Sequence, residues 1–175
     1  MHEEMWEKAA AFHGHQCPGL AIGFRVVEAV REKMGVSQSD DEELVCVTEN
    51  DACGVDAIQA LLSCTFGKGN LIYKGSGKQA FSFFDRTSGK KLRMCLRPNE
   101  HRNQDREAWQ NYLLSAPLDE LFTFTKPTFD VPERARIFNT LVCEVCGEGA
   151  PEHKMRLQDG KTVCLDCFNG YDRGW

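Results

Sequence analysis

Two histidines and a cysteine lie within five residues near the start of the chain. His13, His15 and Cys17 belong to the segment Phe-His-Gly-His-Gln-Cys-Pro-Gly at 12–19. Imidazole nitrogen and thiolate sulfur are ligands that suit zinc, iron or copper and disfavour magnesium or calcium. On an extended chain the three side chains would project to one side, because side chains alternate along such a chain. The pattern indicates either a soft metal site or a nucleophilic thiol beside a base.

A helix is expected to begin directly after this segment. Apolar residues recur at helical spacing and predict a helix over 19–34, preceded by another over 4–12. Pro18 disfavours α geometry at Cys17 and suits the first helical position. Cys17 is therefore expected at or near the N-cap, where the positive end of the helix favours a thiolate.

A second thiol repeats this arrangement further along the chain. A buried strand over 44–48 precedes Cys53, and apolar residues at helical spacing follow it up to residue 62. Asn50 or Asp51 is the predicted N-cap of that helix, which puts Cys53 in its first turn. The other cysteines of this region stand among apolar residues and are expected to pack as small hydrophobic side chains: Cys46, Cys64 and Cys95.

These two segments together predict one site. His15, Cys17 and Cys53 would bind a transition metal, with His13 as a fourth ligand or a proton-transfer group. An open coordination position would make the site catalytic, and a closed one would make it structural or a metal carrier. The residue types leave the alternative of thiol catalysis open.

Four cysteines near the C-terminus form two Cys-x-x-Cys pairs. The first pair is Cys143 and Cys146, and the second, Cys164 and Cys167, follows after 17 residues. This separation falls within the roughly 15–20 residues of zinc ribbons. Four thiolates make a closed tetrahedral shell, which predicts a structural Zn²⁺ with no position free for catalysis.

The residues between and after these pairs predict the shape of the module. Asp159-Gly160 is typical of a hairpin turn, and residues 166–171 are expected to form a short helix that carries the last ligand. Knuckle, hairpin and helix together resemble a treble-clef or ribbon-type zinc finger. A module this small builds little core, so the metal supplies most of its folding free energy.

The rest of the chain indicates an α+β fold. Strands are expected over 71–74, 80–86, 91–97 and 121–126, with a helix over 105–115. Consecutive strands favour a largely antiparallel sheet with packed helices. The predicted domains are an N-terminal domain over 1–132 and a small four-cysteine zinc-finger domain over 133–175, joined by a linker that begins at Pro127.

Glycine-flanked lysines raise the question of an anionic substrate. Gly67-Lys68-Gly69-Asn70 resembles a phosphate loop only loosely, because the Gly-x-x-x-x-Gly-Lys-Ser/Thr pattern is absent. Lys68 and Lys78 could hold an anionic group, or they could be solvated loop lysines.

Composition and charge narrow the function classes. The 175 residues are 42% hydrophobic and 27% charged, as in an ordinary globular protein. A net charge of −5 counts against a nucleic-acid partner. No apolar run approaches the roughly 20 residues that span a bilayer, and the acidic N-terminus lacks a signal-peptide pattern, so a cytoplasmic location is expected. Nine cysteines in that setting favour metal or thiol chemistry over disulfides.

The segment Phe-His-Gly-His-x-Cys-Pro-Gly-x-x-x-Gly at 12–23 resembles the E-subunit family of formylmethanofuran dehydrogenase. The similarity extends to Asn-Asp-Ala-Cys-x-x-Asp-Ala-Ile-Gln at 50–59, Cys-Thr-x-Gly-Lys-Gly-Asn at 64–70 and Gly-Lys-x-Ala-Phe at 77–81. Ser63 stands where the family pattern has glycine. Many members also carry a C-terminal zinc-binding domain, so the resemblance covers nearly the whole chain.

This resemblance implies an α+β domain, an intertwined homodimer and a cleft site. It implies catalytic roles for five residues, namely His13, His15, Cys17, Cys53 and Lys68. The family name also implies association with the subunits of a molybdenum or tungsten pterin enzyme. No cysteine run in this chain has the spacing of an iron–sulfur cluster, so the chain is not expected to be that enzyme itself.

Three hypotheses about the function follow. The leading hypothesis is a metal-binding protein that acts as a metal- or thiol-dependent enzyme, or as an accessory subunit of an oxidoreductase, with a structural zinc module. The alternative is a regulatory protein whose zinc module docks a protein or nucleic-acid partner through Phe168, Tyr171 and Trp175. In a third reading both sites only stabilise the fold.

Overall fold

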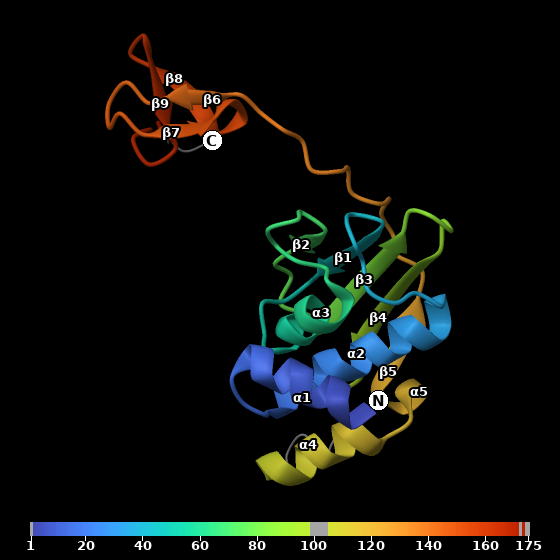
Figure 1. Cartoon of the computed structure of the whole chain (residues 1–175). Helices are drawn as coiled ribbons and strands as arrows, with labels where there is room; N and C mark the ends of the chain where they lie inside the picture. The colour runs from blue at the N-terminus through green and yellow to red at the C-terminus, as the bar shows by residue number, and fades with distance from the viewer. Residues whose placement is uncertain (1, 99–104, 172, 174–175) are drawn as a thin grey trace. The chain divides into compact units, whose positions relative to one another are not determined.

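The chain divides into two compact units. The computed structural model describes residues 2–98, 105–171 and 173 (Figure 1). The larger unit spans 1–135 and the smaller spans 136–175. The division falls close to the predicted boundary between residues 132 and 133.

A five-stranded mixed sheet forms the centre of the larger unit. Its strand order is β2-β1-β3-β4-β5. The strands are β1 (Leu44–Thr48), β2 (Leu71–Tyr73), β3 (Ala80–Asp85), β4 (Lys91–Leu96) and β5 (Phe122–Thr125). All neighbouring pairs are antiparallel except β1 and β2, which run parallel. The predicted α+β fold with a largely antiparallel sheet is confirmed, and the parallel pair arises because helix α3 (Gly54–Leu62) connects β1 to β2 as a crossover.

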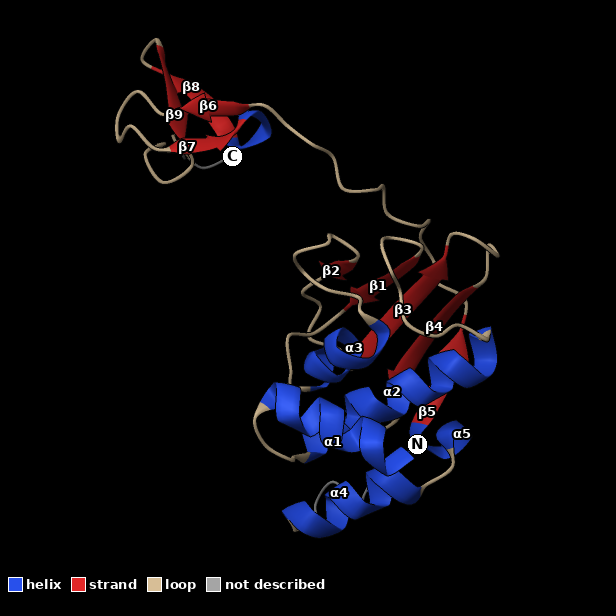
Figure 2. Cartoon of the chain, viewed as in Figure 1, coloured by secondary structure: helices blue, strands red, loops and turns tan. Residues whose placement is uncertain are grey.

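Helices gather on one face of this sheet (Figures 1 and 2). Besides α3 they are α1 (His2–His13), α2 (Pro18–Met34), α4 (Arg106–Ser115) and the short α5 (Leu118–Leu121). The central helix α2 contacts α1, α3, α4 and β4. No helix in the described ranges is both long enough and apolar enough to cross a membrane.

Alternation along the strands separates two apolar clusters. Leu44 and Cys46 of β1 face the main core under the helices. Val45 and Val47 face the other side, where they meet Phe84 and a smaller group of residues. Strand β1 is therefore buried on both faces, which explains why its sequence is continuously apolar.

Helices α2 and α3 meet through their backbones. A Cβ atom built on Gly23 of α2 would lie 1.9 Å from the carbonyl oxygen of Gly54. A Cβ atom on Gly54 would lie 3.0 Å from the carbonyl oxygen of Gly19. Only residues without side chains permit this approach, and it brings the first turns of the two helices together.

Two hairpins make up the smaller unit. The first consists of β6 (Thr140–Val142) and β7 (Gly149–Pro151), and the second of β8 (Met155–Gln158) and β9 (Lys161–Cys164). A single 3-10 turn, η2 (Glu152–Lys154), joins them. Asp159 and Gly160 connect β8 to β9 with φ of 51° and 76°, so the predicted Asp-Gly hairpin is confirmed.

The helix predicted over 166–171 is wrong, because the described residues of this segment form a turn followed by irregular chain. The side chain of Gln158 accounts for the difference. Its Oε1 accepts the backbone N–H of Asn169 at 2.9 Å, and its Nε2 donates to the carbonyl of Asn169 at 3.0 Å. These bonds hold the segment against β8 and take up backbone groups that a helix would use.

Replacing Gly23 by alanine is expected to lower the free energy of unfolding of the larger unit by about 2 kcal/mol. Overpacking against Gly54 costs about 3 kcal/mol, and the better helix propensity of alanine returns about 1 kcal/mol. Urea unfolding followed by circular dichroism measures the change. Gly67→Ala is the matched control, because a Cβ atom there meets nothing within 4 Å. Equal stability of the two variants would contradict the close contact.

Candidate functional site

The predicted thiols come together at the N-termini of α2 and α3. Cys17 is the N-cap of α2, as predicted, and its Sγ accepts the backbone N–H of Leu20 at 3.3 Å. Cys53 is the N-cap of α3. A Cβ atom on Gly19 would lie 3.4 Å from Sγ of Cys53 and 3.9 Å from Sγ of Cys17. The two sulfur atoms therefore border one small space that a side chain at residue 19 would fill.

The N-cap predicted at Asn50 or Asp51 is wrong. Asn50 holds the turn before the helix, because its Oδ1 accepts the N–H of Ala52 at 3.2 Å and its Nδ2 donates to the carbonyl of Lys78 at 3.0 Å. The helix begins only after this turn. The effect is to bring Cys53 to the helix start, beside Cys17.

His13 completes the group from the end of α1. Its ring nitrogens face two different partners: Nδ1 lies 2.7 Å from Oδ2 of Asp56, and Nε2 lies 3.7 Å from Sγ of Cys17. The ligand atoms of His13, Cys17 and Cys53 all lie within 4.8 Å of one another. Gln59 donates to the other carboxylate oxygen of Asp56 at 3.2 Å and so helps to orient it.

His15 lies outside this group. The three side chains do not project to one side as they would on an extended chain, because α1 continues to His13 and Gly14 then adopts a left-handed φ of 92°. His15 is exposed, with its ring centroid 4.5 Å from that of His13. The structure thus assembles the two thiols with His13, which was predicted as a fourth ligand or proton-transfer group, while His15 is not part of the group of ligand atoms.

Lys68 faces another part of the unit. Its Nζ donates to the backbone carbonyls of Ser39 at 2.9 Å and Asp40 at 3.4 Å. It does not line the cavity beside the thiols. A catalytic role for Lys68 stays a prediction, and the contacts seen are those of a residue that holds two loops together.

A cavity of about 490 Å³ opens beside the cluster. His13, Cys53 and Asp56 form part of its wall, and the ends of β1 and β2 form another part. Two aromatic side chains at its border, Phe66 and Tyr73, are 78% and 53% exposed. No lysine or arginine of the described chain lines it. A ligand in this cavity would therefore reach the cluster without meeting a cationic side chain.

The cluster fits a metal by the chemistry of its donors. In a tetrahedral zinc site a sulfur and a nitrogen ligand lie about 3.6 Å apart, close to the 3.7 Å between Cys17 and His13. A ligating histidine almost always donates its second ring N–H to a carboxylate or carbonyl, as His13 is placed to do toward Asp56. Burial, and then the adjacent Cys17 thiol, raise the pKa of Cys53 when no cation is bound. A cation between the sulfur atoms would favour the thiolate instead.

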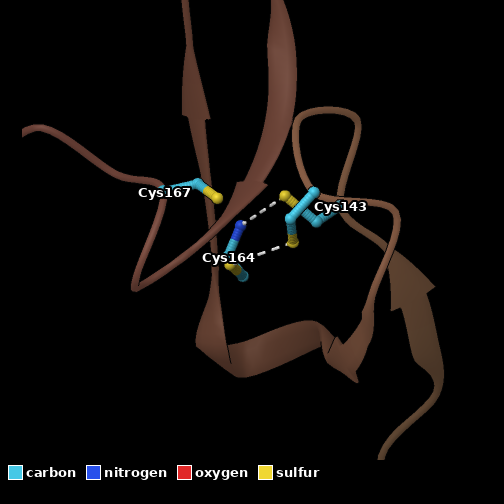
Figure 3. Close-up of side chains that lie close together, drawn as sticks. Cys143, Cys164 and Cys167 are labelled. Atoms are coloured by element: carbon cyan, nitrogen blue, oxygen red, sulfur yellow. Dashed lines mark hydrogen bonds between the residues drawn. The ribbon is translucent and has the colours of Figure 1, made fainter.

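The second cluster has the form of a closed zinc site. The four Sγ atoms of Cys143, Cys146, Cys164 and Cys167 lie within 4.8 Å of one another. Those of Cys146 and Cys164 are 3.9 Å apart, near the roughly 3.8 Å edge of a tetrahedral zinc–thiolate shell. Figure 3 shows three of these side chains gathered about one point.

Hydrogen bonding shifts the pKa values of two of these four thiols in opposite directions. Backbone N–H groups, first that of Cys146 and then that of Cys164, lower the pKa of Cys143 to about 6. The neighbouring Cys164 thiol and burial raise the pKa of Cys167 to about 12. Four thiolates at this spacing therefore require a cation, which is the role of a structural Zn²⁺.

Comparison with known proteins matches each of the two units to a known family model. Residues 12–123, more than half of the chain, match the family model described as FmdE, molybdenum formylmethanofuran dehydrogenase operon. The chain belongs to the FmdE family. Residues 136–173 match the prokaryotic DksA/TraR C4-type zinc finger, so this FmdE-family protein carries a zinc finger on its C-terminal side.

Two individual proteins are similar over nearly the whole chain. The crystal structure of a tungsten formylmethanofuran dehydrogenase FmdE-like protein from Syntrophus aciditrophicus is 26% identical, with a TM-score of 0.73 over 95% of this chain and 91% of that one. A protein of Archaeoglobus fulgidus named as a probable S-adenosyl-L-methionine-binding protein is 29% identical over 94% of this chain. The present chain spans 52% of the length of that relative.

Sequence reasoning gave no role to Asp56 and Gln59. Both belong to the segment at 50–59. Asp56 lies three residues after Cys53 and Gln59 three residues after Asp56, so each is the neighbour of the one before it on the helix surface. That spacing was a usable signal. What it could not show is that His13, 43 residues away, lies against this face.

In the FmdE-family chain, Cys167→Ala is expected to remove one zinc per chain and to unfold the smaller unit alone, because most of the folding free energy of such a module comes from the metal. Elemental mass spectrometry and amide hydrogen exchange measure the two effects. Cys95→Ala is the control, since that thiol lies in β4 and in neither cluster. A smaller unit that keeps its exchange protection without zinc would refute the structural role.

Proposed function

We propose that the larger unit of this FmdE-family protein binds a transition metal through His13, Cys17 and Cys53 and uses it to bind or transform a small molecule. The observation that carries the proposal is the placement of His13 between the Asp56 carboxylate and the Cys17 thiol. Zinc sites with two cysteines and one histidine keep a fourth position for water or substrate. A bound metal would supply Lewis-acid chemistry at that position.

The protein residues would bind and orient the metal and its ligand. The N–H of Leu20 supports the Cys17 thiolate, and Asp56 keeps the Nδ1 proton on His13 so that Nε2 is free to ligate. Asp51 borders the cavity, and its carboxylate makes no hydrogen bond or ion pair among the described residues. With Asp51 present and no cationic side chain, the cavity favours a neutral or positively charged small molecule.

The family description and the name of one relative bear on the partner and on the ligand of this protein. Matching the molybdenum formylmethanofuran dehydrogenase operon family supports the proposal of an accessory role beside such an enzyme. S-adenosylmethionine is a positively charged molecule and a direct ligand to test, although the relative that carries that name is about twice as long as this chain. Homodimerisation and docking of a partner by the zinc module stay predictions. Three aromatic residues were predicted to form the docking surface. Tyr171 is 77% exposed, Phe168 packs against the small core, and Trp175 lies outside the described residues.

A thiol catalyst is the second candidate, and one observation favours it. Asp56, His13 and Cys17 lie in the order of orienting acid, base and nucleophile. In that case His13 would accept the proton of Cys17, and the metal content of the larger unit would be zero. The two candidates therefore differ in a measurable quantity.

Metal content per chain is the deciding experiment. Protein purified without oxygen or chelators is expected to contain two metals per chain by elemental mass spectrometry, one in each cluster. Cys17→Ala and Cys53→Ala should each lose one metal, and Cys95→Ala should lose none. One zinc per chain in all four proteins would contradict the metal site. Rapid alkylation of Cys17 that is lost in His13→Ala would then establish the thiol candidate.

Asp56→Asn is expected to weaken metal binding by the larger unit about 10- to 100-fold, because His13 loses the acceptor that fixes its ring. Competition with a chromophoric chelator measures the affinity. The absorption of the Co²⁺ form should also shift, which a merely structural role would not produce. Asp51→Asn is the matched control, since it removes a carboxylate of the same cavity that touches no ligand; equal losses in both variants would overturn the orienting role.

A further inference from the structure

The face of the sheet opposite the helices carries a separate depression. Side chains alternate at the ends of β1 and β2, so Thr48 and Tyr73 border the cavity described above while Glu49 and Lys74 face the other side. The depression has a volume of about 380 Å³. The side chains that matter for its chemistry are Glu49, Lys74, Lys78, Arg93, Lys126 and Phe129.

Its single acid is already neutralised. Nη2 and Nε of Arg93 donate to Oε1 of Glu49 at 2.7 and 2.8 Å, and the Ser76 hydroxyl donates to Oε2 at 2.7 Å. Burial raises the pKa of Glu49, but these hydrogen bonds outweigh it and lower the pKa overall, so the carboxylate stays ionised. Glu49 and Arg93 thus form a satisfied ion pair on the lining of the depression.

Three lysines remain beyond this ion pair. None of them forms an ion pair of its own among the described residues, although the charge of Lys78 also helps to lower the pKa of Glu49. Nζ of Lys74 lies 4.7 Å from the centroid of the Phe129 ring, a cation–π contact that leaves its charge in place. Lys78 and Lys126 are exposed, and neither makes a hydrogen bond or ion pair through its ammonium group within the described chain. Four cationic side chains and one carboxylate leave an excess of three positive charges around the depression, in a chain whose net charge is −5.

We propose that this depression binds a small polyanion, a molecule with two or more neighbouring phosphate or carboxylate groups. Lysine ammonium groups are mobile point charges that suit such ligands, and a concave surface of one sign concentrates the opposite charge. The volume lies within the range of small-molecule sites. The depression is independent of the metal cluster, since β1 separates the two. It also gives a role to Lys78 of the Gly-Lys-x-Ala-Phe segment, which has no part in the metal cluster.

Isothermal titration calorimetry of the full chain at low ionic strength tests the proposal. The probes are inorganic phosphate, a hexose bisphosphate and tricarballylate, which distinguish phosphate from carboxylate ligands. Saturable binding is expected for the bisphosphate or the tricarboxylate, stronger than for inorganic phosphate. Lys78→Gln and Lys126→Gln should each weaken it about tenfold, the usual effect of losing one charged hydrogen bond.

Two controls separate a site from bulk charge and from the metal cluster. Lys8→Gln removes an exposed lysine of α1 and should leave the affinity unchanged. Cys17→Ala should also leave it unchanged, so failure of the metal proposal does not decide this one. No saturable binding by any probe, or equal weakening by Lys8→Gln, would overturn the proposal. Binding of a single-stranded oligonucleotide that depends on Lys78, with none of the small anions, would overturn it in favour of a nucleic-acid interface.

Discussion

The backbone contact between α2 and α3 is the constraint on which the larger unit depends. Gly23 and Gly54 allow an approach that any side chain would prevent, and this approach brings the start of α3 against the first two turns of α2. Helix N-termini are positive and favour sulfur anions, but burial and the neighbouring thiol raise the pKa of Cys53, so a thiolate there needs a cation as well. Cys17 and Cys53 lie at these N-termini because each is the residue at which its helix begins. The cluster is thus a consequence of helix packing, and the histidine is added by a third helix.

A single strand then divides the chemistry of this unit between two faces. Side chains alternate between the two faces along β1 and the residue that follows it. Thr48 therefore borders the cavity on the helix side, and Glu49 borders the depression on the open side. The cavity on the helix side has no cationic side chain among the described residues, whereas the depression on the open side has four. Because side chains alternate along a strand, one sheet presents two surfaces that differ in charge.

The two cysteine clusters show two ways to bring metal-ligating side chain types together. In the zinc finger each pair of ligands is local, and two short hairpins need only bring one pair to the other. In the larger unit the ligands come from three different helices, so the site forms only after a core has folded. The first arrangement makes folding depend on the metal, and in the second the group of donor atoms depends on the fold. The described part of the smaller unit accordingly has four buried apolar or thiol side chains in its core. Two of them, Cys143 and Cys164, are ligands, and Cys167 packs against this core.

Local patterns in the sequence determined the elements and the donor types. Helical periodicity, the Cys17-Pro18 start of α2, the Asp-Gly hairpin and the two Cys-x-x-Cys pairs each act over a few residues, so their structural outcome follows from neighbouring residues alone. Only the tertiary structure decided that His13 is the histidine beside Cys17 and Cys53 and that Asp56 contacts its ring. It also decided that Lys78 and Lys126 line one depression away from these thiols. Those outcomes depend on how helices and strands distant in sequence pack against one another. The helix expected after Cys164 failed for the same reason, because a side chain from β8 captured its backbone.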